Sequence, residues 1–160
     1  MGNSGYYTAQ ICMRGHVITS IADSNPESLQ NYCEKCGSET IKECPTCSNE
    51  IKGSSRKPTL VLNYSPPSFC PECGEAYPWT ESRIEGAKEL IEVAEELSEK
   101  DKELVKDYID QIAEDTQKAD SAAIKFKKKL SDVAGPIRDR LYDYAMDLAS
   151  ETIKKMIEES

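Results

Sequence analysis

The sequence predicts a small α+β protein in two parts: a cysteine-rich region of short antiparallel strands, and a helical region after it. Two observations support this division. All seven cysteines and the only histidine lie in the first 73 residues. After Trp79 the chain has a single proline and two glycines, so turn-forming residues become rare. We therefore place a boundary at about residues 79–82, between domains 6–79 and 82–159.

The first region contains short apolar and β-branched runs separated by turn-forming residues. We expect strands at Tyr6–Cys12, Val17–Ala22, Glu39–Glu43 and Thr59–Tyr64, of which the last has the strongest pattern. Asp23–Gln30 is expected to be a loop or a short helix because it contains Asn-Pro. Gly53–Pro58 is expected to be a turn or a flexible loop.

In the second region apolar residues recur at helical spacing, which predicts four helices with one buried face each. Ser82 begins a capping box for the first helix, and Ser98 and Thr116 are N-cap candidates for the second and third. Pro136 suits the first turn of a fourth helix, which continues to Met156. Short links between these helices favour an α-helical bundle, with long helical hairpins as the alternative.

The cysteines and the histidine have the spacing of metal ligands. They form four pairs along the chain: Cys12/His16, Cys33/Cys36, Cys44/Cys47 and Cys70/Cys73. A C-x-x-C turn places two sulfurs on one side of a tight loop, and three of the four pairs have this spacing. Gly37 and Gly74 follow two of these turns, where a positive φ is expected. The odd number of cysteines also favours metal binding over a disulfide framework.

Structural zinc takes four protein ligands, so eight ligands predict two closed Zn²⁺ sites and a double zinc ribbon. Without Cys12 and His16, one site would lack two ligands. Cysteine ligands that stay reduced also predict a cytoplasmic protein.

Two arrangements of the pairs remain open. Seven residues separate Cys36 from Cys44, and an extended segment of that length spans roughly 23 Å, so the second and third pairs cannot share an ion. A sequential arrangement joins the first pair with the second and the third with the fourth. A crossed arrangement, as in a RING-like cross-brace, joins the first with the third. We favour the sequential one because each site then closes a shorter loop.

The order of these motifs resembles a family of uncharacterised bacterial zinc-ribbon proteins. The motifs are Cys-x-x-Gly-His, Cys-x-x-Cys-Gly, Cys-Pro-x-Cys and Cys-Pro-x-Cys-Gly, followed by Tyr77-Pro78-Trp79-Thr80. The resemblance covers about residues 6–85. It implies a bacterial cytoplasmic protein with metal ligands at the eight positions above, and it implies no activity.

Charge favours a protein partner over nucleic acid. The formal net charge is −9, and residues 81–160 contribute −7 of it. Seven thiolates and two Zn²⁺ ions would take the net charge to −12. Phosphate backbones favour the opposite sign. The exception is the basic run Lys125–Lys129, with Phe126 inside it, which supports the alternative of a nucleic-acid-binding accessory protein.

The remaining residues offer little for catalysis. Once zinc is bound, no histidine or cysteine is left to act as a base or nucleophile, and we assign no catalytic residue. No apolar run is long enough to span a membrane. The sequence therefore predicts a non-enzymatic zinc-binding adaptor that binds another protein. A zinc-dependent enzyme subunit completed by a partner is a third possibility.

Overall fold

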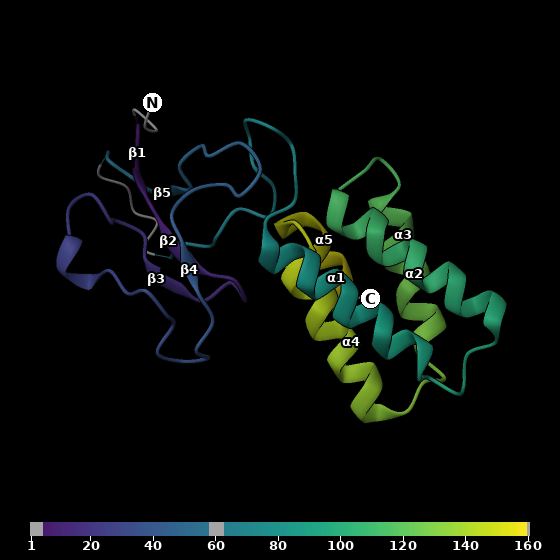
Figure 1. The fold of residues 1–160 in the computed structure, drawn as a ribbon. Coiled ribbons are helices and arrows are strands. Elements are labelled where there is room, and N and C mark those ends of the chain that lie inside the picture. The colour runs from purple at the N-terminus through teal and green to yellow at the C-terminus, as the bar shows by residue number, and fades with distance from the viewer. Residues whose placement is uncertain (1–4, 58–62, 160) are drawn as a thin grey trace. The chain divides into compact units, whose positions relative to one another are not determined.

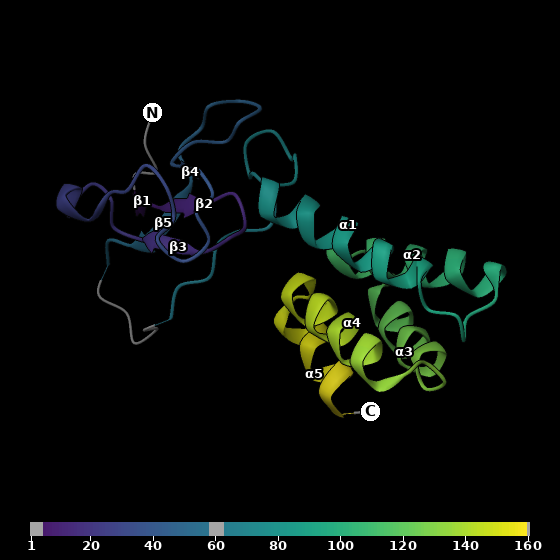
Figure 2. The ribbon, with the colours of Figure 1, turned by 60° about the horizontal axis from the view of Figure 1, so that its bottom comes forward.

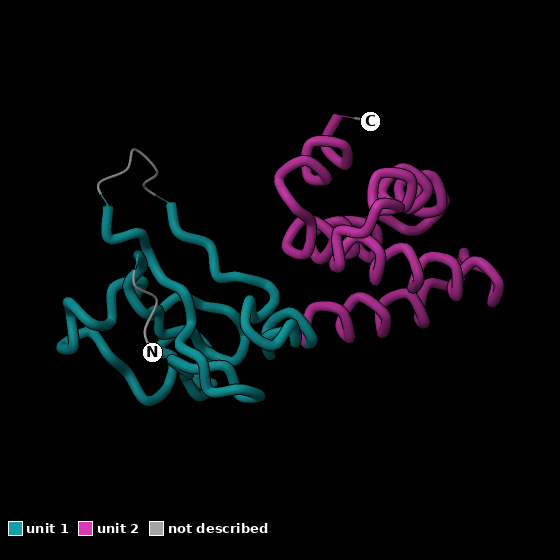
Figure 3. Tube along the Cα trace, turned by 90° about the horizontal axis from the view of Figure 1, so that it is seen from above, with its two compact units in different colours: residues 1–81 teal, residues 82–160 magenta. Residues whose placement is uncertain are grey.

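The structure is a computed structural model that describes residues 5–57 and 63–159 (Figure 1). The chain divides into two compact units, residues 1–81 and residues 82–160 (Figure 3). The dividing point lies inside helix α1 (Pro78–Glu92), which begins in the first unit and ends in the second.

In its described residues the first unit has two small antiparallel sheets. In one of them β1 (Tyr6–Thr8) pairs with β5 (Lys52–Ser55). In the other β2 (Gln10–Cys12) is the central strand, between β3 (Val17–Thr19) and β4 (Thr40–Ile41). A short 3₁₀ helix, Pro26–Ser28, lies within the segment expected to be a loop or a short helix.

The prediction of one strand at Tyr6–Cys12 is wrong, because the chain changes sheets at Ala9. The Ala9 amide donates to the Ile51 carbonyl oxygen at 2.8 Å, and β1 and β2 then pair with different partners. The predicted strands Val17–Ala22 and Glu39–Glu43 are present in shortened form as β3 and β4. Most of Thr59–Tyr64 lies outside the described residues, so that prediction stays open.

The prediction of a turn or a flexible loop at Gly53–Pro58 is wrong for residues 53–55, which belong to β5, and Pro58 lies outside the described residues. A glycine, Gly53, occupies this strand position because neighbouring backbones approach it too closely for a side chain. A Cβ at this position would lie 2.7 Å from the Tyr7 carbonyl oxygen and closer still to that of Ser20. A glycine in a strand can mark such an approach as well as a turn.

The core of the first unit is small and lies against one of the two cysteine groups. Its buried members are Ala9, Ile11, Cys44, Ile51, Cys70, Tyr77 and Trp79. The rings of Tyr77 and Trp79 stack with their centroids 4.7 Å apart. The Trp79 indole also donates to the Pro67 carbonyl oxygen at 3.0 Å. Tyr77 and Trp79 therefore join the start of α1 to the cysteine-rich part of the chain.

The described residues of the helical part form five helices rather than the four predicted, and the first of them begins in the first unit. Figure 2 shows these helices. They are α1, α2 (Glu99–Glu114), α3 (Ala119–Leu130), α4 (Gly135–Leu148) and α5 (Glu151–Glu159). Buried residues from all five form one cluster, so the helices make a bundle and not separate hairpins. Among the described residues, no helix is both long enough and apolar enough to cross a bilayer.

Of the first three predicted helix starts, two differ from the structure and one is confirmed. The first helix begins at Pro78 instead of Ser82, because the Tyr77 carbonyl oxygen already accepts from Thr80 and Glu81. Ser98 caps α2 as predicted, since its hydroxyl accepts from the Asp101 amide at 3.1 Å. Thr116 lies before α3, and its hydroxyl accepts from the Lys118 amide without being the cap residue.

The predicted fourth helix starts as expected but is two helices in the structure. α4 begins at Gly135 with Pro136 in its first turn. Ala149 then leaves the helical region with ψ 149°, and the Ser150 hydroxyl accepts from the Ile153 amide at the start of α5. The break therefore occurs at a serine cap, and no glycine or proline is present at this point of the sequence.

Candidate metal centres

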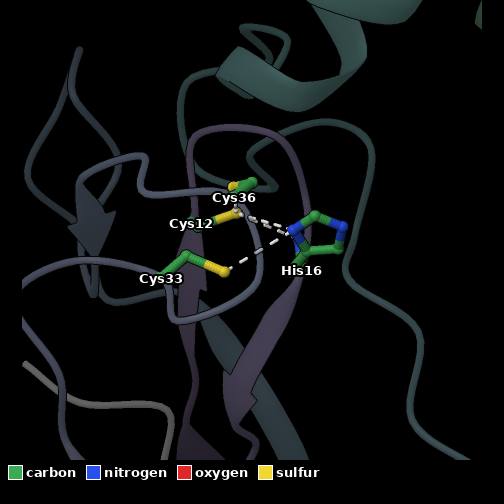
Figure 4. Close-up of side chains that lie close together, drawn as sticks. All are labelled: Cys12, His16, Cys33 and Cys36. Carbon is green, nitrogen blue, oxygen red and sulfur yellow. Dashed lines mark hydrogen bonds between the residues drawn. The ribbon is translucent and has the colours of Figure 1, made fainter.

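The first centre combines the ends of two strands with one C-x-x-C turn (Figure 4). Cys12 ends β2 and His16 directly precedes β3, so the hairpin between them places both side chains at its tip. The Cys12 sulfur lies 3.5 Å from His16 Nδ1 and 3.7 Å from the Cys36 sulfur. The Cys33 sulfur lies 3.6 Å from the same His16 nitrogen.

The hairpin turn holds its two ligands by backbone hydrogen bonds. The Cys12 amide donates to the His16 carbonyl oxygen, and the Gly15 amide donates to that of Cys12, both at 2.9 Å. Gly15 has φ +94°, a conformation that glycine adopts without steric cost. The Cys-x-x-Gly-His motif therefore forms a tight turn with both ligand side chains facing one point.

The second centre joins two C-x-x-C turns that are distant in the sequence. The Cys44 sulfur lies 3.7 Å from that of Cys73, and the Cys47 sulfur lies 3.6 Å from that of Cys70. Cys44 and Cys70 are buried, whereas Cys47 and Cys73 lie at the surface. The centre is thus anchored in the core on one side and reaches solvent on the other.

All three C-x-x-C turns share one backbone design. The first cysteine's carbonyl oxygen accepts from the amide four residues later, at 2.7–2.8 Å in each turn. The donors are Gly37, Ser48 and Gly74, and all have positive φ. Each turn is also closed by an antiparallel bridge, at Tyr32–Glu39, Glu43–Glu50 and Phe69–Ala76. Repeated local geometry therefore presents each pair of sulfurs in the same way.

The spacing of the ligand atoms fits a tetrahedral metal ion. Around a tetrahedral Zn²⁺, two sulfurs lie about 3.8 Å apart and a sulfur and a nitrogen about 3.6 Å apart. The measured separations are 3.6–3.7 Å between sulfurs and 3.5–3.6 Å between sulfur and nitrogen. All seven cysteines are free thiols, and within each centre the ligand atoms lie within 4.8 Å of one another. Each group can therefore hold one ion.

The electrostatics of the first centre differ from sulfur to sulfur. Burial raises the pKa of Cys12, against the hydrogen bonds that the backbone amides of His16 and Arg14 donate to its sulfur. Hydrogen bonds from the Ser38 side chain and amide lower the pKa of Cys36 to about 6. The Ser38 hydroxyl oxygen lies 3.4 Å from that sulfur. Cys36 is therefore more easily converted to a thiolate ligand than Cys12.

In the second centre the pKa values of Cys70 and Cys73 are shifted in opposite directions. Burial acts to raise the pKa of Cys70, but the amides of Cys73 and Glu72 outweigh it and bring the value down to about 6. The Glu75 amide favours the Cys73 thiolate, yet burial and the three neighbouring cysteines raise its pKa to about 12. Four crowded sulfurs cannot all ionise without a compensating positive charge. A bound cation supplies it, so this donor set fits a metal.

The eight predicted ligands thus lie together in two groups, which follow the sequential arrangement: Cys12, His16, Cys33 and Cys36, and then Cys44, Cys47, Cys70 and Cys73. The crossed arrangement is not formed. No third group of three or more potential ligands was found within residues 5–57 and 63–159. Sequence reasoning missed the hydroxyl of Ser38 beside Cys36. Its signal was a hydroxyl-bearing residue two positions after the second cysteine of a turn.

The basic run lies on α3, outside both centres. Phe126 is fully buried, as its place on the apolar face predicts. The Lys127 ammonium donates to the Ile157 carbonyl oxygen, and that of Lys129 lies 2.8 Å from the Asp101 carboxylate. Lys125 and Lys128 are exposed.

No curated protein and no solved structure matches this chain. A protein family described as uncharacterised and conserved in bacteria, DUF2321, matches residues 5–157. The match includes both candidate metal centres and continues through the helices, well beyond the 6–85 segment that carried the sequence resemblance. The chain therefore belongs to this bacterial family, DUF2321.

Proposed function

We propose that the protein is a non-enzymatic adaptor in which two structural Zn²⁺ ions hold the first unit and the helical unit binds a partner protein. The observation that carries the metal assignment is the tetrahedral spacing of two four-ligand groups. One group offers four thiolates and the other three thiolates and an imidazole. Soft sulfur ligands at these distances suit Zn²⁺ better than oxygen-preferring ions such as Mg²⁺ or Ca²⁺.

The proposal of a structural role rests on the number of ligands. A catalytic zinc usually has three protein ligands and keeps a position for water or substrate. Each group here supplies four ligands, so a bound ion has its tetrahedral positions filled. The same groups use every cysteine and the only histidine of the chain. Thiolate ligands also favour a reducing compartment, and we propose the cytoplasm.

A row of carboxylates on α1 supports a protein partner. Glu81, Glu85 and Glu89 are exposed and follow at intervals of four residues, so they lie along one helix face. Within the described part of the chain, none of the three has an ion-pair partner. Residues 81–160 carry a net charge of −7. This face suits a partner with a complementary row of lysines or arginines.

The nucleic-acid alternative depended on Lys125–Lys129 and has less support. Lys127 and Lys129 contact other helices of the same unit, so only part of the run faces solvent. The exposed carboxylates of the unit would also repel a phosphate backbone.

The metal assignment is tested on the full chain, purified under reducing conditions and analysed by native mass spectrometry. We expect two zinc ions per chain. Cys36→Ser and Cys73→Ser should each lose one ion and keep the other. Fewer than two ions in the unaltered protein would overturn the assignment.

The adaptor proposal is tested by cross-linking in extracts of a bacterium that makes the protein. The variant carries Glu81→Gln, Glu85→Gln and Glu89→Gln, and the matched control carries Glu114→Gln, Asp132→Asn and Glu158→Gln. Both change the charge by the same amount at exposed positions. A partner lost with the first variant and retained with the control supports the proposal. Equal cross-linking with both, or binding to added nucleic acid at low salt, contradicts it.

A further inference from the structure

Tyr77 is placed in the core beside the second metal centre. Its side chain is fully buried and belongs to the same cluster as Cys44 and Cys70. One ring face stacks on Trp79 at an interplanar angle of 16°. The Tyr77 amide also donates to the Ser68 carbonyl oxygen, two residues before Cys70. The stack on Trp79 and the backbone hydrogen bond to Ser68 therefore both fix the position of Tyr77.

The hydroxyl of Tyr77 lacks an ordinary partner. It is buried, and it has no hydrogen bond of good geometry among the described residues. A buried hydroxyl without a partner is costly, and most such groups in folded proteins have one. Tyr77 packs in the same buried cluster as Cys44 and Cys70, and burial together with the neighbouring Cys70 raises the pKa of its hydroxyl. The sulfur of Cys70 is therefore a candidate acceptor for this hydroxyl.

We propose that the Tyr77 hydroxyl donates a hydrogen bond to the metal-bound thiolate of Cys70. This proposal rests on the zinc assignment above. A neutral thiol is a weak acceptor, whereas a thiolate is a charged one and forms a stronger bond. The hydroxyl thus gains its partner when the ion binds. Tyr77 is a positioning residue that orients Cys70 and draws negative charge from its sulfur.

The two centres then differ in the surroundings of the hydroxyl group that lies beside a ligand sulfur. In the first centre the hydroxyl beside a sulfur is that of Ser38, next to the half-buried Cys36. In the second centre it comes from a tyrosine in the dry core, at the fully buried Cys70. A hydrogen bond in a dry environment is electrostatically stronger than one that competes with water. The second centre should therefore depend on its hydroxyl more than the first does.

The test is Tyr77→Phe in the full chain, which removes one oxygen and keeps the stacked ring. Zinc affinity is measured by competition with a chromophoric chelator. Loading with ¹¹³Cd separates the centres, because a four-sulfur site and a three-sulfur, one-nitrogen site give distinct resonances. We expect two ions to remain, with affinity at the four-sulfur centre about tenfold lower and its resonance shifted.

Ser38→Ala is the matched control, because it removes a hydroxyl beside the other centre. It should shift only the resonance of the three-sulfur, one-nitrogen centre. If Tyr77→Phe leaves the four-sulfur affinity and resonance unchanged, or raises the unfolding temperature of the zinc form, the hydroxyl has no thiolate partner and the proposal is overturned. Failure of the zinc assignment looks different, since the unaltered protein would then hold fewer than two ions.

A second measurement needs no substitution. In the ¹¹³Cd form of the unaltered protein, a hydrogen bond to Cys70 should give the Tyr77 hydroxyl proton slow exchange and a scalar coupling to the metal. A rapidly exchanging, uncoupled proton overturns the proposal even if Tyr77→Phe fails to fold.

Discussion

Ser48 occupies the same place in its turn as Gly37 does in the preceding one, and both have left-handed backbones, with φ +64° and +74°. Each residue follows the second cysteine of a C-x-x-C turn, and its amide donates a hydrogen bond to the carbonyl oxygen of the first cysteine. Glycine adopts this conformation freely, whereas a residue with a Cβ is strained there. One of the three turns is therefore built with a strained residue.

Ser48→Gly should relieve this strain and stabilise the zinc form of the first unit by about 0.5–1 kcal/mol. Thermal unfolding followed by Trp79 fluorescence measures the effect. Gly37→Ser is the reciprocal change and should destabilise the unit by a similar amount. A lower unfolding temperature for Ser48→Gly would show that the Ser48 side chain contributes more than the strain costs.

Metal removal should separate the two units. The first unit has a core of seven buried residues that includes two of the proposed ligands, whereas the helices have a larger core of their own. Each structural zinc contributes on the order of 10–16 kcal/mol to folding. A chelator should therefore unfold residues 6–78 and expose Trp79, while most of the helical circular dichroism remains. Loss of the helical signal in proportion to zinc release would contradict this expectation.

The grouping of the eight potential ligands could be predicted from the sequence because ligand spacing is a local property. A C-x-x-C turn needs only the residues within it, and closing short loops favours the arrangement found for Cys44 and Cys70. The hydroxyl of Tyr77 could not be assigned in this way. Its place beside Cys70 depends on the stack with Trp79 and on the core around both.

The errors in the fold arise where distant parts of the chain decide local structure. The break at Ala9 depends on β5, more than 40 residues later, which pairs with β1 while β2 pairs elsewhere. Gly53 is needed because another backbone passes close to it, and its sequence neighbours gave the pattern of a turn. Helix α1 starts early because Tyr77 and Trp79 are buried with the first unit.

The pair formed by Asp101 and Lys129 makes the helical unit sensitive to acid. The Lys129 ammonium, 2.8 Å away, holds the pKa of Asp101 below its usual range. A carboxylate with a lowered pKa stabilises the fold above its unfolded pKa of about 3.9, and this stabilisation is lost as the pH falls through the folded value. Urea unfolding at pH 6 should therefore show Asp101→Asn to be less stable than the unaltered protein.

The same comparison near pH 2 is the control, followed by helical circular dichroism. The difference between the two proteins should shrink there, because protonation removes the charge of Asp101 and the asparagine of the variant carries none. NMR titration of Asp101 in Lys129→Met should give a higher pKa than in the unaltered protein. A difference in stability that persists unchanged at pH 2 would mean that Asp101 acts by packing rather than by charge.

Gly86 in α1 lies directly under the ring end of Tyr144 in α4. A Cβ at Gly86 would be 2.7 Å from the Tyr144 hydroxyl oxygen and 2.9 Å from Cζ. The ring also has a cation–π contact, since the Arg140 guanidinium lies 4.7 Å from its centroid. Alanine would gain about 1 kcal/mol in helix propensity, against an overpacking cost of about 1–3 kcal/mol. We expect Gly86→Ala to destabilise the helical unit by up to about 2 kcal/mol.

A double-mutant cycle with Tyr144→Ala separates these two effects. Once the ring is removed, Gly86→Ala should stabilise the unit by about 1 kcal/mol, because only the gain in helix propensity remains. Urea unfolding of the four proteins, followed by helical circular dichroism, measures the coupling. If Gly86→Ala has the same effect with and without the ring, then Tyr144 moves aside freely and glycine is not required for the packing of α1 on α4.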